Sequence, residues 1–166
     1  MRLILFISVI ACLSLTACKQ QNSVTESREP ENFLVRFSDP VSFPFEIWPD
    51  SQEVDLGIEI NFFEDKVLLE KSAEKIKSLP LYCMVMGDDS RLVMDKKFEI
   101  NIWDKKTNSW AGEKTEKAGE RKISAKAITG LKVNKGRWTF KLYANTKTEE
   151  NIAGISKVTF LLKPAK

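Results

Sequence analysis

The sequence contains no histidine among its 166 residues. Histidine supplies the usual general base at neutral pH and is a common zinc ligand, so its absence excludes Ser-His and Cys-His nucleophile systems. The glycine signatures GxGxxG, GxxxxGK[ST] and GxSxG, which mark dinucleotide, nucleoside triphosphate and α/β-hydrolase sites, are absent too. The sequence therefore predicts a non-catalytic protein that needs no cofactor.

Acidic residues leave one catalytic alternative open. Two carboxylates suffice to hydrolyse a glycoside, and Asp88, Asp89 and Asp95 are the candidates. Asp88 and Asp89 lie between Gly87 and Ser90, which is the composition of a hairpin loop, so a polar turn is the favoured interpretation. The same residues lack the D-x-[DN]-x-[DN]-G spacing of a calcium loop, and no metal site is predicted.

Long hydrophobic runs are also scarce. The one long uncharged run is LILFISVIACLSLTA, the 15 residues from Leu3 to Ala17, with Arg2 in front of it. This run suits the apolar region of a signal peptide but falls short of the roughly 20 residues that span a bilayer. Residues 1–17 are therefore predicted to be a targeting segment.

The end of this leader, Leu15-Thr16-Ala17-Cys18, resembles the lipobox of bacterial lipoproteins. The resemblance implies cleavage between Ala17 and Cys18, a diacylglycerol on the Cys18 sulfur, and a fatty acid such as palmitate on the new amino group. Three acyl chains would anchor the protein firmly in a membrane. The alternative is a plain secretory leader with an incidental cysteine.

Lys19 bears on where such a lipoprotein resides. In the sorting rule of some bacteria an Asp after the acylated cysteine retains the protein on the inner membrane. Lys19 therefore points to the outer membrane, facing the periplasm. The rule is not general, so inner and outer membranes both stay open.

The mature chain would have 149 residues, enough for one domain. Its net charge of about +2 and its lack of a basic patch do not favour nucleic acid as a partner. Cys83 would be its only cysteine besides the lipidated one, which rules out an intramolecular disulfide. Because Cys83 lies in the apolar run LYCMVM, we expect a buried, unreactive thiol.

The polar segment from Lys19 to Asn32 has Val24 as its only aliphatic residue. Such a segment buries too little apolar surface to offset its ordering entropy, so residues 18–32 are predicted to form a lipidated, flexible tether. On this hypothesis, deleting Ser23 to Glu29 leaves the melting temperature unchanged. The folded domain is predicted to span residues 33–166.

The domain reads as mostly β. Apolar residues alternate with polar ones from Val54 to Phe62, the period of a strand with one buried face. Short strands with turns between them and no βαβ alternation favour an immunoglobulin-like antiparallel β-sandwich. The other predicted strands are Phe33–Phe37, Ser42–Trp48, Leu81–Met86, Phe98–Trp103, Ile123–Ile128, Arg137–Ala144 and Ile155–Leu162.

One segment departs from this pattern. From Asp65 to Leu79 the apolar positions follow helical spacing, and Pro80 would end the helix. The sequence predicts one amphipathic helix inserted between strands, which covers an open end of the sheets or, alternatively, grips a partner.

A second resemblance concerns the domain itself. The stretch Val41–Ile47, the expected helical insert, the run Gly130–Leu142 and the closing Val158–Leu162 resemble a family of small bacterial lipoproteins whose domain has no assigned function. The resemblance would cover most of residues 40–163. It implies fold and location and carries over no catalytic residues.

The tryptophans form the most distinctive local pattern. A hairpin with its loop at Lys105 to Asn108 would pair Trp103 with Trp110. Continued along the strands, this register places Glu99 opposite Lys114 and Lys97 opposite Glu116. Because Phe98, Ile100 and Ile102 occupy the inner face, Trp103 is expected on the outer one.

Two neighbouring tryptophans on a polar face can anchor a partner; alternatively the helix or the tether covers them. Trp48 and Trp138 are expected to be ordinary core or sheet-edge residues. The favoured hypothesis is a lipid-anchored protein that binds another protein, as an envelope assembly factor, an inhibitor or a toxin-immunity protein. A glycan or peptidoglycan binder that stacks sugars on Trp103 and Trp110 is the alternative, and an acidic-residue hydrolase is the least favoured.

Overall fold

The computed structural model describes residues 23–48 and 52–165. The predicted signal peptide, its cleavage site at Ala17 and the predicted lipidation site Cys18 lie outside the described residues. Within those residues no helix is long and apolar enough to cross a membrane.

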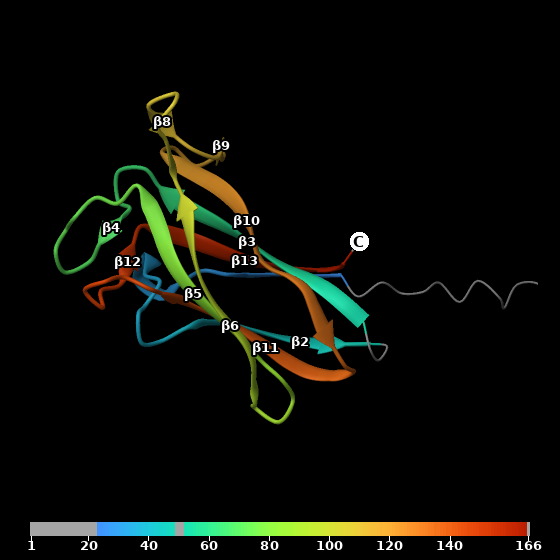
Figure 1. Cartoon of the computed structure of the whole chain (residues 1–166). Helices are drawn as coiled ribbons and strands as arrows, with labels where there is room; N and C mark the ends of the chain where they lie inside the picture. The colour runs from blue at the N-terminus through green and yellow to red at the C-terminus, as the bar shows by residue number, and fades with distance from the viewer. Residues whose placement is uncertain (1–22, 49–51, 166) are drawn as a thin grey trace, which may run out of the picture.

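Two antiparallel sheets face each other and make an open sandwich (Figure 1). The larger sheet has the order β1-β13-β3-β10-β9, and the smaller has the order β2-β11-β5-β6. The larger sheet consists of β1 (Val24–Arg28), β13 (Ile155–Pro164), β3 (Gln52–Phe63), β10 (Glu120–Val133) and β9 (Glu113–Lys114). The smaller consists of β2 (Val41–Ile47), β11 (Gly136–Ala144), β5 (Ser78–Met86) and β6 (Leu92–Asn101). The prediction of an antiparallel β-sandwich is confirmed.

Two short ribbons complete the fold. One pairs β4 (Leu68–Leu69) with β12 (Ile152–Ala153), and the other pairs β7 (Trp103–Asp104) with β8 (Ser109–Trp110). A short 3-10 helix, η1 (Glu31–Phe33), follows β1.

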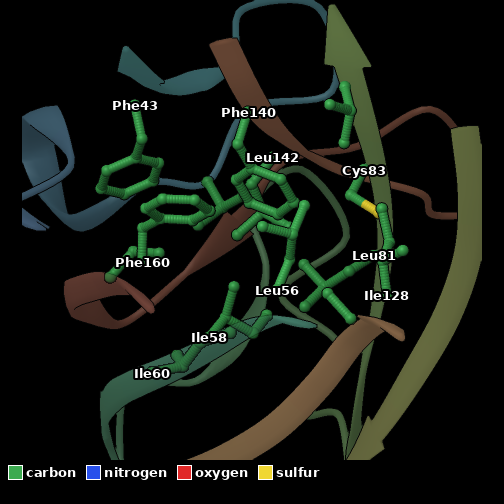
Figure 2. Packing of buried hydrophobic residues seen from close by; sticks show 14 of the residues in the cluster. Phe43, Leu56, Ile58, Ile60, Leu81, Cys83, Ile128, Phe140, Leu142 and Phe160 are labelled. Atoms are coloured by element: carbon green, nitrogen blue, oxygen red, sulfur yellow. The ribbon is translucent and has the colours of Figure 1, made fainter. Parts of the chain in front are cut away.

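The core lies between the two sheets and follows from the alternation seen in the sequence. In β3 the inward side chains of Val54, Leu56, Ile58, Ile60 and Phe62 are all fully buried. Figure 2 shows the aromatic part of the core, where three phenylalanine rings from β2, β11 and β13 meet. The ring of Phe160 lies 5.1 Å from that of Phe140 and 5.6 Å from that of Phe43, centre to centre.

Cys83 lies in this core with no exposed surface. Burial raises the pKa of its thiol to about 11, so at neutral pH the thiolate form is rare. The prediction of a buried thiol is confirmed.

The tether predicted for residues 18–32 is wrong over its described part. Val24 to Arg28 form the edge strand β1, which pairs with β13 from Val24 opposite Leu162 to Arg28 opposite Val158. The Ser27 hydroxyl lies 2.9 Å from that of Thr159. Backbone hydrogen bonds to an open sheet edge order this polar segment without a large buried side chain.

The helix predicted from Asp65 to Leu79 is also wrong. The described segment makes turns and the two-residue strand β4, and β5 begins at Ser78. The backbone amides of Lys71 and Ser72 donate to the Glu150 carboxylate at 3.1 and 2.9 Å, and Ala73 has a left-handed φ of 53°. An isolated helix of this length is marginal in water, so these long-range partners override the helical spacing.

Candidate functional site

The predicted tryptophan hairpin is present. Trp103 pairs with Trp110, as the sequence predicts, and Asp104 pairs with Ser109. The Asp104 carboxylate accepts a hydrogen bond of 2.8 Å from the Lys106 amide, which fixes the loop. Accordingly, hydrogen bonds from the Lys106 and Thr107 amides and from the Thr107 hydroxyl lower the pKa of Asp104.

The two indole rings meet edge to face, with centres 5.2 Å apart and planes at 85°. Trp110 also packs on Phe62, a core residue of β3, at a ring distance of 6.0 Å. The Lys77 ammonium lies 4.7 Å from the centre of the Trp103 ring, a cation–π contact. Both tryptophans are half-buried. Trp110 packs against the edge of the core, whereas part of the Trp103 indole is exposed beside the Lys77 ammonium.

The predicted inner face is confirmed, since Ile100 and Ile102 are buried and Phe98 packs against the core. The two predicted charge pairs are wrong. Glu99 lies opposite Pro80 and Lys97 opposite Tyr82, because β6 pairs with β5. On the other side of the hairpin, Lys114 pairs with Arg121 of β10.

The chain leaves the hairpin at Gly112, which explains why the pairing is so short. Gly112 has a φ of 84°, and a Cβ there would lie 2.4 Å from the Lys122 carbonyl oxygen. Only glycine fits this close approach to β10. The two strands therefore diverge after the tryptophans instead of extending into a long ribbon.

The hairpin lies at the end of the fold opposite to the beginning of β1 (Figure 1). β3 runs from Gln52 at one end to Phe62, beneath Trp110, at the other. Ten residues of strand correspond to roughly 33 Å. We call this the distal end, because it lies away from the beginning of β1.

No motif in the sequence indicates the buried polar cluster that lies near the distal end. The Glu120 carboxylate, 4% exposed, accepts hydrogen bonds from Ser156 at 2.5 Å, Thr115 at 2.5 Å and Asn61 at 3.2 Å. Burial by itself would raise the pKa of Glu120. These hydrogen bonds and the nearby Lys117 lower the pKa by a larger amount, so it lies below its ordinary value. In the sequence, Glu120 is a single glutamate at the start of a strand, and its position does not distinguish it from an exposed glutamate.

Replacing this carboxylate is expected to destabilise the fold in a pH-dependent way. Because the folded-state pKa of Glu120 is lowered, its ionised form stabilises the fold above the unfolded-state pKa, and this contribution disappears as the pH falls through the folded-state value. Glu120→Gln should cost about 1–3 kcal/mol at pH 7. Urea unfolding is measured at pH 7 and at about pH 3. The difference in unfolding free energy between the variant and wild type should be smaller at the lower pH. A difference in unfolding free energy that is the same at both pH values would contradict this account. Glu113→Gln, which changes an exposed glutamate, is the control.

The acidic candidates do not form one site. Asp89 lies in the turn between β5 and β6, where its carboxylate accepts a hydrogen bond of 3.0 Å from the Arg91 amide. Asp88 lies in the same turn, beside Gly136. Asp95 lies in β6 and accepts a hydrogen bond of 2.7 Å from the Tyr82 hydroxyl. Among the described residues, no group of three or more carboxylate or thiol side chains is placed to hold a metal ion.

Asp95 instead belongs to a groove on the outer face of the smaller sheet. The groove has a volume of about 510 Å³, and Tyr82 and Tyr143 lie side by side in it with ring centres 6.0 Å apart. The hydrogen bond to Asp95 raises the pKa of Tyr82 to about 12. Other lining residues are Phe37, Met84, Lys97, Ala144 and Asn145.

A larger hollow of about 750 Å³ lies over the outer face of β3, β10 and β13. It forms where the pairing of β10 with β3 is interrupted between Lys126 and Leu131. The Asp55 carboxylate lies at its wall, where it accepts a hydrogen bond of 3.0 Å from the Gly130 amide and pairs with Lys126 at 3.5 Å.

The chain matches no protein-family profile and no curated protein. Among solved structures it is similar to the VP2 subviral particle of infectious bursal disease virus, with 10% identity and a TM-score of 0.40 over 88% of this chain. It is also similar to dimeric latent PorU from Porphyromonas gingivalis, with 10% identity and a TM-score of 0.37 over 87% of this chain. The chain spans 33% of the first structure and 13% of the second. These similarities are too distant to bear on function.

Proposed function

We propose that this protein is a non-catalytic lipoprotein of the bacterial envelope, anchored through Cys18, whose distal hairpin binds a protein partner. The observation that carries the proposal is the edge-to-face pair of Trp103 and Trp110, half-buried beside the Lys77 ammonium. Tryptophan is enriched among the residues that dominate protein–protein binding energy, and these two rings are held in place by packing on each other and, through Trp110, on Phe62. We assign the sandwich to the immunoglobulin-like type, which carries many such binding proteins.

The position of the hairpin supports this proposal. A lipid anchor at the N terminus would leave the opposite end of the sandwich directed into the periplasm. The indole of Trp103 would then be presented roughly 33 Å beyond the beginning of β3. A partner would meet this end first, whether it is an envelope assembly, an inhibited enzyme or a delivered toxin.

The anchor itself has a direct test. Cys18→Ser is expected to leave the precursor uncut and to abolish incorporation of labelled fatty acid, because the thiol is the acceptor in the lipobox chemistry. Cys12→Ser, within the leader, is the matched control and should be labelled like wild type. Equal labelling of Cys18→Ser and wild type would reject the lipid anchor.

The hairpin has a test that separates binding from folding. Trp103→Ser should weaken capture of the partner about thirtyfold, the loss typical of a binding hot spot, and should leave the melting temperature within a few degrees of wild type. Trp48→Ser, which removes an exposed tryptophan at the other end of β3, should capture normally from detergent-solubilised envelope, where no bilayer is present. Affinity capture from the native envelope, with mass spectrometry of what co-purifies, provides the measurement.

A Trp103→Ser variant that captures the wild-type partner in full would reject the hairpin as the binding site. Glycan binding is the second candidate, and the groove with Tyr82 and Tyr143 favours it. The perpendicular Trp103 and Trp110 rings offer no flat platform for a sugar, whereas the tyrosines lie beside hydrogen-bonding groups such as Asn145. Co-sedimentation with peptidoglycan sacculi, unaffected by Trp103→Ser, would favour this alternative.

A further inference from the structure

The end of the sandwich opposite to the hairpin exposes three large apolar side chains. Trp48 is 54% exposed, Leu92 47% and Val93 43%. Trp48 follows the last residue of β2, and Leu92 and Val93 begin β6. Apolar side chains of this size, gathered at one end of a fold, mark an interaction surface.

Short contacts connect the segments that carry these residues. The Lys135 ammonium lies 3.8 Å from the centre of the Trp48 ring. The next residue, Gly136, lies against the β5–β6 turn, since a Cβ at this position would be 3.6 Å from the Cβ of Asp88. The turn between β10 and β11 therefore joins the end of β2 to the β5–β6 hairpin. We call this surface the apolar end and define it as Trp48, Leu92 and Val93.

The strand β1 begins at the same end of the sandwich, as Figure 1 shows. Val24 lies opposite Leu162, which in turn lies opposite Leu56, and β3 begins four residues before Leu56. Val24 is therefore about 13 Å along the strands from the beginning of β3. Cys18 precedes Val24 by six residues, which span about 20 Å at most. An acylated Cys18 thus places the bilayer surface no more than about 7 Å beyond the beginning of β3.

The charges at this end indicate how it would meet a membrane. Three of its basic side chains have acidic partners at hydrogen-bonding or slightly longer distance, and a fourth, Lys135, lies against the Trp48 ring, which leaves little net charge to attract anionic lipid. Apolar insertion, with tryptophan at the headgroup level, is then the main contribution to binding. The pairs are Arg91 with Asp89 at 3.0 Å, Arg137 with Glu46 at 3.4 Å and Lys132 with Glu53 at 4.0 Å.

We propose that the apolar end docks on the surface of the phospholipid bilayer, with Trp48, Leu92 and Val93 inserted among the headgroups. This inference rests on the proposed lipid anchor, which holds the chain at the membrane. The docked end fixes the sandwich upright, so that the hairpin is presented at a constant height instead of swinging on a long tether.

Quenching by brominated lipid tests the docking. The acylated protein is reconstituted in phosphatidylcholine vesicles with bromine near the headgroup end of the acyl chain, and tryptophan emission is measured. Wild type should lose part of its emission, at low and at high salt alike. Trp48→Phe should lose this quenchable part, whereas Trp103→Phe, which removes a tryptophan at the distal end, should keep it.

A second pair of variants tests the apolar contact itself. Leu92→Ser with Val93→Ser should reduce the quenching at least twofold, whereas Phe33→Ser, which removes an apolar side chain that is 51% exposed and packs near Phe63, should not. Two outcomes would overturn the docking and leave the anchor intact. Wild type could bind the vesicles without loss of tryptophan emission, or Trp48→Phe could be quenched as much as wild type. Wild type that fails to co-sediment with vesicles would reject the anchor and the docking together.

Discussion

Phe160→Ala is expected to lower the free energy of unfolding by about 3–5 kcal/mol, the usual cost of truncating a buried aromatic side chain. Phe160 is fully buried, and its ring contacts those of Phe43, Phe45 and Phe140 at distances of 5.6, 5.2 and 5.1 Å. These rings come from both sheets, so the truncation leaves a cavity where the sandwich is held together. Urea unfolding followed by circular dichroism provides the measurement.

The neighbouring residue on the same strand is the control. Leu161 points to the outer face of β13 and is only partly buried, so Leu161→Ala should cost about 1 kcal/mol or less. Equal losses for the two variants would mean that the inward and outward faces of β13 are assigned wrongly.

Deleting Ser23 to Glu29 is expected to lower the melting temperature by roughly 5–8 °C, equivalent to about 2 kcal/mol for a domain of this size. The deletion removes all of β1 and leaves the edge of β13 unpaired from Val158 to Leu162. It also removes the guanidinium of Arg28, which lies 5.9 Å from the centre of the Phe43 ring. An exposed edge strand also promotes association, so the variant should elute as larger species in gel filtration.

Deletion of Lys19 to Asn22 is the control, because it shortens the chain while keeping β1. It should leave the melting temperature unchanged. If deletion of Ser23 to Glu29 also left it unchanged, the segment would be the flexible tether that its polar composition predicts, and β1 would contribute no stability.

The tryptophan hairpin shows what local sequence can predict. Its loop composition and its register are local features, so Trp103 opposite Trp110 follows from the sequence and is observed. The extension of that register to Glu99 and Lys114 fails, because β6 and β9 find other partners. No local sequence pattern shows at which residue the two strands of a hairpin separate and pair with other strands.

The failed helix between Asp65 and Leu79 has a similar cause. Its apolar spacing satisfies a helix, but the Glu150 carboxylate, which lies far along the chain, accepts hydrogen bonds from two of its backbone amides. These hydrogen bonds, together with those from Ser72 and Thr148 side chains, lower the pKa of Glu150, which is consistent with an ionised acceptor. The spacing of apolar residues within a segment carries no information about hydrogen-bond partners that lie far along the chain.

The sequence by itself determined the strand character of the chain, the inward faces of β3 and β6, the burial of Cys83 and the tryptophan pair. Each of these depends on side-chain polarity at a fixed local period, which the sequence records directly. The tertiary structure alone decided that Val24 to Arg28 form an edge strand, that Glu120 is buried among three donors, and that Trp48 lies beside the β10–β11 turn. These features depend on backbone hydrogen bonds and on contacts between distant segments, and a backbone hydrogen bond is the same for every residue type except proline.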